Sequence, residues 1–531
     1  MKKIYYFFPL FLAIAVACGF YLGKKNNFPY LTNNSVSNEK GLDSKKKLFQ
    51  VLDVIEKDYV DSISSKELTD KTIKQLLSNL DPHSVYIPYK KFNREEEELR
   101  GEFAGVGVKF IILNDTLNVT NVIANGPSSR AGIKNGDVII RIDTTLVAGV
   151  NLKNDQVMKL LKGKPSTEVK VEILRNGEII NKEIVRGLIP INSVTASFMI
   201  SEDVGYIKLV RFSETSAKEF YYSAQKLLQK GMKKLVFDLR GNGGGYLQVA
   251  ENIVDEFLEK DLMMVYTKDK QGKGSKAYST ENGILKNIGL AILIDSESAS
   301  ASEIVAGAIQ DNDRGTIYGR RSFGKGLVQK PVMLSDSSSL RITIAKYYTP
   351  TGRCIQKSYE NKSHYDYMME MYDREKSGEL FALDSSVFVD SLKYTTPKGK
   401  IVYGGGGISP NVFIPFDTVG YSSYYRKIAY SRVLTEFSIN YLSVHRKKLS
   451  DKSLNHYLKN FKVTDQLFNS FVAFAETKKI KGSSKDLSTS KLRLKSRIKE
   501  EIASGIWDEE GREYINSRTN KDLKVVLDDF Q

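Results

Sequence analysis

The chain has 531 residues, and at roughly 150 residues per domain this length predicts three to four domains. Hydrophobic residues at 41% and charged residues at 27% are ordinary for a globular protein, and 39 glycines and 12 prolines exclude a collagen-like or broadly disordered chain. Two cysteines exclude a disulfide framework and a multi-cysteine zinc site, four histidines leave little room for histidine-rich metal chemistry, and 79 Lys and Arg against 63 Asp and Glu give a net charge of +16.

The N-terminus carries one long apolar segment. Residues 4–23 are uncharged and lie between two pairs of lysines. A helix of that length spans about 30 Å, enough for one bilayer crossing. The segment is longer than the core of a secretory signal peptide and no clean small-residue cleavage site ends it, so we expect an uncleaved signal-anchor over residues 1–25. A cleaved signal peptide and lipoprotein processing at Cys18 remain alternatives, and all three place the rest of the chain outside the cytoplasmic membrane.

Residues 26–100 are predicted to form a tether followed by a helical region. Residues 26–45 are rich in Asn, Ser and Lys, which favours a tether. Apolar residues then recur at helical spacing over residues 46–80, until Asp81-Pro82 interrupts the pattern.

Residues 101–186 indicate a small β-rich module with two helices. A glycine-spaced loop over 101–108 leads into the first strand. Asn176-Gly177 is the pair that two-residue hairpin turns favour, and it predicts a β-hairpin. The strand patterns lie at 108–113, 117–123, 169–174 and 179–185, and the helical patterns at 128–131 and 152–161.

From residue 187 to residue 418, strands alternate with helical patterns, which is typical of an α/β core. The strand patterns lie at 204–209, 234–239 and 289–294, and the helical patterns at 249–258 and 302–309. Residues 355–400 are polar and irregular, which favours an insertion. The fold class predicted is therefore α/β, and α+β over the whole multidomain chain.

The last segment, residues 419–531, is helical in pattern and basic. By count residues 421–531 carry about +8, half of the net charge. Such a tail could bind nucleic acid, an anionic membrane or a cell-wall polymer. Nucleic acid is not expected behind an export signal, and a solvated helix face is the plainest interpretation.

One serine-rich turn has the pattern of an acyl-transfer site. Residues 294–304 read Ile-Asp-Ser-Glu-Ser-Ala-Ser-Ala-Ser-Glu-Ile, so a buried strand ends, small residues turn and a helix begins. At that place free backbone N–H groups and the helix dipole favour negative charge. Acyl transfer needs a nucleophile beside such donors, which hold the oxyanion. Serines are also common helix N-caps, so this turn alone is a weak signal.

A serine nucleophile needs a base, and a lysine fits better than any histidine. His83 follows a helix stop and reads as a turn or packing residue. Lys325 lies between two glycines, which allow close backbone approach. Lysine acts as a base only when neutral, and burial lowers its pKa. If the segment is extended, Gln329 lies on the same face and could orient the amine, whereas an isolated Gly-Lys-Gly is more often an exposed turn.

A glycine cluster, Asp238-Leu-Arg-Gly-Asn-Gly-Gly-Gly-Tyr, ends another strand before a helix. It lacks the lysine and Ser/Thr pattern of a P-loop. In a hydrolase it would bring a second backbone N–H to the oxyanion.

Seven segments between residues 46 and 415 together resemble the carboxyl-terminal processing peptidases, the tail-specific serine proteases of family S41 with a Ser-Lys dyad and an embedded PDZ domain. The segments are Leu80-Asp-Pro-His-Ser, Gly105-Val-Gly-Val, Ala131-Gly-Ile-Lys-Asn-Gly-Asp-Val, Asp238-Leu-Arg-Gly-Asn-Gly-Gly, Ser298-Ala-Ser-Ala-Ser-Glu, Phe323-Gly-Lys-Gly and Tyr348-Thr-Pro-Thr-Gly-Arg. They occur in the family's order, and their combination makes the match specific. Cys354 departs from the small polar residue that members often carry.

The resemblance implies a role for each matching residue. Ser300 would be the nucleophile, Lys325 the base and Gln329 the residue that positions the lysine. The N–H groups of Ala301 and Gly244 would form the oxyanion hole. Asp311 matches an acidic position that supports the site. The peptide-binding loop would comprise Phe103, Ala104, Gly105, Val106, Gly107 and Val108, and no metal or other cofactor is implied.

The resemblance also implies the architecture. The core over 187–418 would be a ClpP/crotonase-like α/β protease domain, with the PDZ domain inserted at 101–186. The signal-anchor over 1–25, the helical region over 26–100 and the extension over 419–531 would flank them.

The expected protein is therefore a serine endopeptidase of the bacterial cell envelope, anchored in the inner membrane with its catalytic domain in the periplasm. Its partners would be protein substrates with free C-terminal tails and the membrane, and not nucleic acid; a homo-oligomer or an adaptor protein stays open. Two other classes compete with it, namely a non-catalytic PDZ scaffold that binds peptides and a basic protein that binds nucleic acid or cell wall through its tail.

Overall fold

The computed structural model describes residues 39–383 and 388–531. The predicted signal-anchor, Cys18 and most of the tether lie outside the described residues. No helix in the described ranges is long and apolar enough to cross a membrane. The chain divides into two compact units, residues 1–73 and 74–531.

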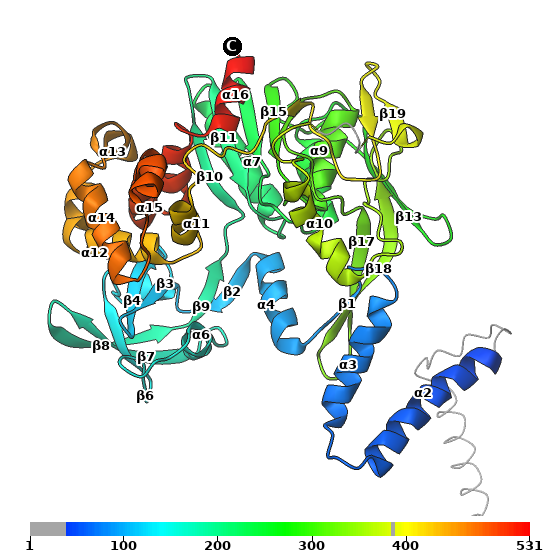
Figure 1. Ribbon diagram of the computed structural model, residues 1–531, viewed down its shortest axis with the longest axis horizontal. Coiled ribbons are helices and arrows are strands. Elements are labelled where there is room, and N and C mark those ends of the chain that lie inside the picture. The colour runs from blue at the N-terminus through cyan, green and yellow to red at the C-terminus, as the bar shows by residue number, and fades with distance from the viewer. Residues whose placement is uncertain (1–38, 384–387) are drawn as a thin grey trace, which may run out of the picture. The chain divides into compact units, whose positions relative to one another are not determined.

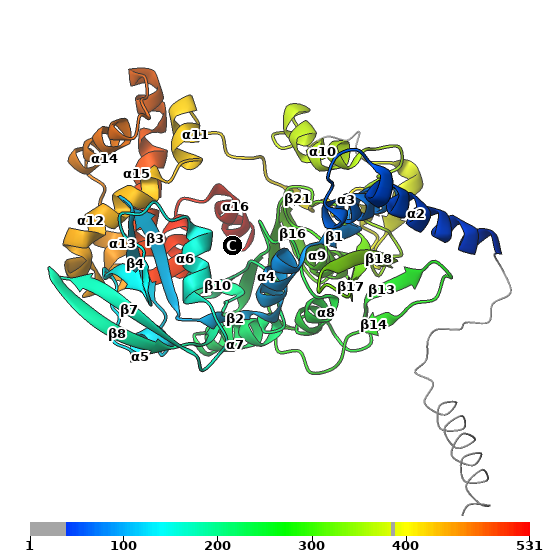
Figure 2. The same cartoon turned by 90° about the horizontal axis from the view of Figure 1, so that it is seen from below.

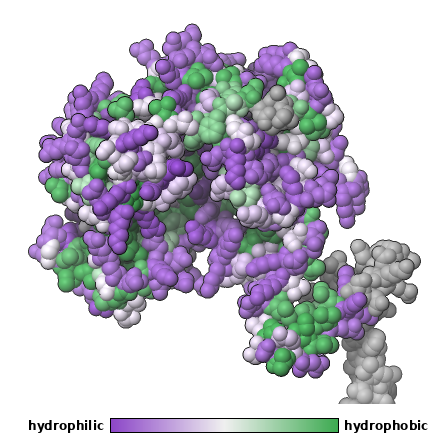
Figure 3. Space-filling model, in the orientation of Figure 1, coloured by the Kyte–Doolittle hydropathy of each residue, from purple (hydrophilic) through white to green (hydrophobic). Residues whose placement is uncertain are grey.

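The first unit contributes helix α2, Glu39–Asp58, and most of α3, Ser65–Ser78. The helical spacing over residues 46–80 thus predicted helices correctly. Apolar side chains such as Phe49, Val54 and Val60 are exposed here. Figure 3 shows a green, hydrophobic area in this part of the chain.

A six-stranded sheet forms the centre of the second unit, and it confirms the α/β alternation. Its order is β10-β11-β12-β15-β16-β21; β10 and β11 pair antiparallel and the remaining neighbours pair parallel. The strands are β10 Val194–Met199, β11 Val204–Leu209, β12 Lys234–Asp238, β15 Gly289–Ile294, β16 Thr316–Gly319 and β21 Val412–Phe413. The helices α7 Ser216–Gln229, α8 Leu247–Asp255 and α9 Ala301–Asp311 lie between successive parallel strands in the sequence (Figure 1).

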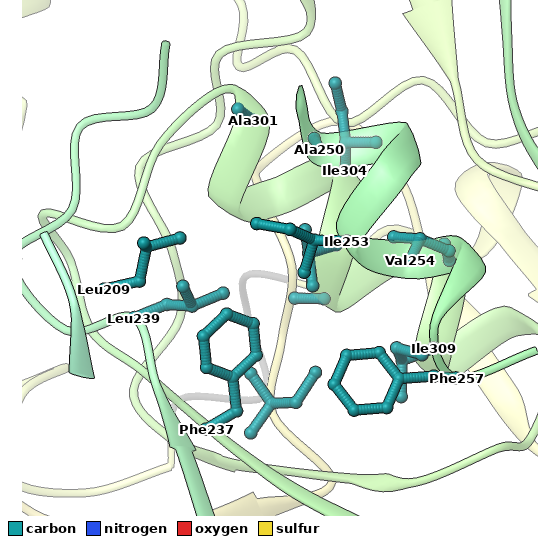
Figure 4. Close-up of a cluster of buried hydrophobic side chains, with 14 of the residues drawn as sticks. Leu209, Phe237, Leu239, Ala250, Ile253, Val254, Phe257, Ala301, Ile304 and Ile309 are labelled. Atoms are coloured by element: carbon teal, nitrogen blue, oxygen red, sulfur yellow. The ribbon is translucent and has the colours of Figure 1, made fainter. Parts of the chain in front are cut away.

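Successive residues of a strand point to opposite faces of the sheet. Both faces of this sheet are buried, each in its own apolar cluster. Phe237 and Ile292 pack with residues of α7, α8 and α9 in one apolar cluster, which Figure 4 shows in part. Val236 and Leu293 pack into a second cluster on the other face, with residues of the C-terminal helices. Figure 2 shows α7 and α16, Lys521–Asp529, on opposite sides of β10.

The C-terminal extension is therefore a layer of the core. Phe471, Leu494 and Val526 are fully buried in the second cluster. Its other helices are α11 Ser423–Ala429, α12 Val433–Ser450, α13 Leu454–Asn460, α14 Asp465–Thr477 and α15 Ser484–Asn516. Deletion of residues 421–531 would expose the face of the sheet that these helices cover. A binding defect in such a variant could therefore come from unfolding and not from the loss of a binding surface.

A second sheet contains β17, the strand that begins two residues after Lys325. Its order is β1-β18-β13-β14, with β17 also paired to β18. The strands are β1 Val85–Ile87, β13 Met263–Asp269, β14 Lys276–Tyr278, β17 Leu327–Met333 and β18 Ser339–Tyr348. The expectation of an irregular segment over 355–400 is wrong in part, because its polar pattern still forms α10 His364–Lys376, whose Ser363 caps the N-terminus. The 3-10 turn Asp390–Leu392 and the strand pair β19 Lys393–Thr395 and β20 Ile401–Tyr403 follow.

The β-rich module forms its own six-stranded sheet and core. Its order is β3-β4-β5-β7-β8, with β6 paired to β5, so β3 is an edge strand. The elements are β3 Val108–Leu113, β4 Thr116–Val122, α5 Pro127–Arg130, β5 Val138–Ile142, β6 Thr145–Leu146, α6 Asn154–Leu161, β7 Glu168–Arg175 and β8 Glu178–Val185. Two short paired strands, β2 Glu102–Gly105 and β9 Gly187–Pro190, connect the module to its surroundings, with α4 Tyr89–Arg100 before them.

Candidate active site

Ser300 lies at the turn between β15 and α9, as its sequence pattern predicts. It precedes the first helical residue, Ala301, and has φ 55° and ψ −113°. This backbone region is costly for a residue other than glycine, and such strain persists only where surrounding contacts fix it. The contact that fixes it is a hydrogen bond from Ser300 N–H to Glu303 Oε2, at 2.8 Å.

Lys325 precedes β17 and is largely buried. Burial, aided by the positive charge of Arg341, lowers the pKa of its amine to about 8. The amine donates a hydrogen bond to Gln329 Oε1 at 2.9 Å, so the expected contact between these side chains exists. A bulge between Val328 and Gln329 interrupts the strand, which is therefore less regular than the extended segment we assumed.

Two buried side chains hold Ser300 and Lys325 close together. Glu303 accepts the backbone N–H of Ser300 at 2.8 Å and that of Lys325 at 2.9 Å. Tyr347 donates its hydroxyl to the carbonyl oxygens of the same two residues, at 3.1 and 2.7 Å. No hydrogen bond among the described residues joins Ser300 Oγ to Lys325 Nζ. The amine is instead hydrogen-bonded to Gln329.

Glu303 was not recognised as a functional residue from the sequence. Its carboxylate is fully buried and also accepts Ser322 Oγ at 2.6 Å and Gly324 N–H at 2.7 Å. Burial raises its pKa, and the hydrogen bonds from Ser322, Lys325, Gly324 and Ser300 oppose that shift. An acidic residue three positions after a serine N-cap is the capping-box pattern, and that pattern could have revealed its bond to Ser300.

His83 lies in a turn, as the sequence predicts, and this turn is beside the site. Its carbonyl oxygen accepts a hydrogen bond from Gln329 Nε2 at 2.5 Å. Its ring Nε2 is 2.8 Å from the Tyr367 hydroxyl. Burial, with the nearby charge of Lys325, lowers the pKa of the ring to about 4, so the imidazole is neutral at pH 7. His83 is thus a positioning residue for Gln329.

The glycine cluster touches the serine turn, as predicted. Gly244 has φ 100°, and a Cβ there would lie 2.8 Å from both Ala299 O and Ser300 Cβ. Its N–H donates to Asn242 Oδ1 at 2.9 Å, so the oxyanion role expected of Gly244 requires this bond to break. Ala301 N–H, at the start of α9, has no acceptor among the described residues.

A methyl group at position 244 should therefore destabilise the protein. We expect Gly244→Ala to lower the free energy of unfolding by about 2 kcal/mol, because of the positive φ and the overlap with Ala299 and Ser300. Gly243→Ala is the matched control, since nothing lies within 4 Å of a Cβ at that neighbouring position. Thermal unfolding of both variants measures the difference, and equal midpoints would contradict the geometry.

Asp311 lies away from the serine. It ends α9, eleven residues and hence about 16 Å along the axis from Ser300. Its buried carboxylate is 2.6 Å from Arg353 Nη2 and accepts the Thr351 hydroxyl at 2.7 Å. It therefore anchors the turn around Thr351 and touches neither Ser300 nor Lys325.

The predicted peptide-binding loop is shorter than expected. Residues 103–105 belong to β2, because Phe103, Ala104 and Gly105 pair with β9. Only Val106 and Gly107 remain between β2 and β3, which Val108 begins. Three of the six residues expected in the loop therefore lie in a strand that pairs on one side, and their peptide-binding role stays a prediction.

The fold and the site together describe a hydrolase-type α/β protein: a strained serine at a helix start, a buried amine of lowered pKa, and a separate β-rich module. Three family models match the chain, namely the PDZ domain over residues 104–185, peptidase family S41 over residues 203–363, and a family of unknown function, DUF8443, over residues 424–508.

Curated relatives agree with these matches. A carboxy-terminal-processing protease of Bartonella bacilliformis is 32% identical over 331 residues, which cover 61% of this chain and 75% of the relative. The carboxy-terminal processing protease CtpB of Bacillus subtilis is 33% identical, with 59% of this chain and 65% of the relative covered. A probable CtpA-like serine protease of Staphylococcus aureus is 33% identical, with 58% and 62% covered. The chain belongs to peptidase family S41, among the carboxy-terminal processing proteases.

Solved structures similar to the chain include a photosystem II D1 C-terminal processing protease, 29% identical, with a TM-score of 0.33 and coverage of 58% of this chain and 83% of that one. The PDZ domain of a carboxy-terminal protease from Vibrio cholerae is 25% identical, with a TM-score of 0.16 and coverage of 17% and 97%. Because these TM-scores are low, the fold is described from the sheet topology of this chain and not from these structures.

Proposed function

We propose that this chain is a serine endopeptidase that cleaves proteins near their C-termini with Ser300 as nucleophile and Lys325 as base. The observation that supports this best is a clamp formed by Glu303 and Tyr347, which both hydrogen-bond to the backbones of Ser300 and Lys325. The clamp holds the strained serine near a lysine whose pKa is lowered. Such an arrangement has no evident purpose in a protein that only binds peptides.

In the proposed reaction, the neutral amine of Lys325 removes the Ser300 hydroxyl proton as Oγ attacks the peptide carbonyl. The amine first turns from Gln329 towards the serine, since no hydrogen bond joins the dyad in this conformation of the described residues. Ala301 N–H donates to the oxyanion, and Gly244 N–H joins it once released from Asn242. The protonated lysine then donates to the leaving amine, and afterwards deprotonates the water that hydrolyses the acyl-enzyme.

The PDZ domain would recognise the substrate tail. A free strand edge gives an extended peptide backbone partners, and the turn at Val106 and Gly107 precedes the edge strand β3. The terminal carboxylate would lie at that turn. We propose that the substrates are envelope proteins, with the chain tethered to the inner membrane by residues 1–25 and facing the periplasm.

The first test compares cleavage of unfolded casein by the purified chain and by Ser300→Ala. We expect the wild type to cleave and Ser300→Ala to bind without cleaving, because the alanine fits the same turn and removes only the hydroxyl. A purified Ser300→Ala variant that still degrades casein at the wild-type rate would defeat the assignment. A wild-type chain that binds peptides but cleaves none would favour the scaffold alternative.

The pH dependence of cleavage should reflect the base. Lys325 acts only when deprotonated, and its pKa is lowered to about 8. Therefore kcat/KM should rise as the pH increases through about 8 and level off above it. Initial rates on a fluorogenic peptide between pH 6 and pH 10, each referred to the same buffer series without enzyme, give the profile. A rate that falls as the pH rises through this range would contradict a lysine base.

A further inference from the structure

A cavity of about 370 Å³ lies where the PDZ domain meets the C-terminal helices. The PDZ side of its wall consists of residues of β3 and β4 and of the first residue of α6, Asn154. Ser438, Leu442 and Arg446 form a line on one face of α12, because residues four apart in a helix share a face. Residues of α15 complete the wall.

Asp508 of α15 links the C-terminal helices to the PDZ domain through an ion pair and a hydrogen bond. Its carboxylate is 2.7 Å from Lys109 Nζ of β3 and accepts Asn121 Nδ2 of β4 at 2.8 Å. Asp508 has φ 54° and ψ −154°, a non-helical conformation inside α15. A residue in this backbone region is held there by its surroundings, so the contact with the PDZ domain is a built feature.

The residues that line the cavity include four cations and three carboxylates, which gives a net charge of +1. Its carboxylates are all paired: Asp508 with Lys109, and Glu501 and Glu509 with Arg512, at 2.9 and 3.1 Å. Arg446 donates to the carbonyl oxygen of Gly505 at 2.8 Å but pairs with no carboxylate in the described ranges, and burial lowers its pKa. An anion would compensate it.

Two further wall residues have polar groups without a partner among the described residues. Ser438 is 2% exposed, and its hydroxyl has no hydrogen-bond partner within the described part of the chain. A buried hydroxyl without a partner is costly, and a ligand atom would satisfy it. Arg432, at the start of α12, is exposed and forms no ion pair with a described residue.

We propose that this cavity is a subsite for the substrate tail, which takes an acidic side chain a few residues before the C-terminus. If the terminal carboxylate lies at the turn before β3, the peptide runs antiparallel to β3, and the residues just upstream of the terminus lie opposite Lys109 and Ile111. The C-terminal extension, through Arg446, Ser438 and Arg432, then helps to select substrates. This inference rests on the proposed function in so far as the bound peptide is a substrate.

The test measures peptide binding to the full chain carrying Ser300→Ala, which removes cleavage from the readout. Fluorescence anisotropy compares labelled peptides that carry a single Glu, or Gln, at successive positions before a free C-terminus. At one position we expect Glu to bind about tenfold more tightly than Gln, since a charge-assisted hydrogen bond is worth roughly that factor. Arg446→Gln should remove the preference, and the exposed Arg432→Gln should weaken it, whereas Arg426→Gln on α11, outside the cavity, should leave it unchanged.

Equal affinities of the Glu and Gln peptides at every position would overturn the inference, as would a preference that survives the double change of Arg446 and Arg432. Affinity that falls as the chain concentration rises would show a second copy in the cavity and would also overturn it. The two proposals fail separately. Loss of the acidic preference with intact cleavage refutes only the subsite, and a preference without any cleavage by the wild type refutes only the protease.

Discussion

Replacement of Lys325 by alanine should reduce proteolysis at least about a thousandfold while the chain stays folded. The side chain is the only base proposed for Ser300, and general-base catalysis and nucleophile activation are worth that much or more. The loss should appear in kcat, because we propose that the substrate tail binds at the PDZ domain, away from Lys325. Kinetics on a peptide of defined sequence separates kcat from KM.

Two companion variants sharpen this prediction. Lys325→Arg keeps a cation of similar length but cannot lose its proton at accessible pH, so it should be as inactive as the alanine variant. Lys330→Ala removes an exposed lysine further along β17 and should retain wild-type kinetics. Full activity of Lys325→Arg would show that the amine does not act as a base.

Glu303→Ala should produce the largest loss of stability in the active site. It removes a buried acceptor from four donors, the N–H groups of Ser300, Gly324 and Lys325 and the Ser322 hydroxyl. Because each buried donor left unsatisfied costs free energy, we expect unfolding to become easier by about 3 kcal/mol or more. Calorimetry measures the change.

The same variant should lose activity even below its unfolding temperature, because the serine and lysine backbones are no longer tied to one group. Glu303→Gln keeps one acceptor oxygen and should fall between the wild type and the alanine variant. Glu202→Ala, an exposed glutamate near β11, is the control. A Glu303→Ala variant as stable and active as this control would show that the clamp has no role.

The local patterns of the sequence predicted the parts of the site that depend on neighbouring residues. The alternation of strands and helices placed Ser300 at a helix start, and the four-residue separation placed Gln329 within reach of Lys325. The glycine cluster was expected near the serine, and Gly244 touches it. These relations hold because backbone period and turn chemistry are encoded within a few residues.

Contacts between distant segments were not predictable in the same way. Tyr347 hydrogen-bonds to Ser300, which is 47 positions away in the sequence, and Gln329 hydrogen-bonds to His83, which is 246 positions away. Nothing in the local spacing of either residue indicates its partner. The C-terminal helices were expected to flank the core, whereas Val236 and Leu293 need them as a cover for the second face of the sheet.

Mass spectrometry of the chain quenched during turnover of an activated ester tests whether Ser300 is the nucleophile. We expect an acyl group on the proteolytic fragment that contains Ser300, absent from Ser300→Ala and from Lys325→Ala. An acyl group on another side chain, or rapid cleavage with the Ser300 fragment unmodified throughout, would contradict it.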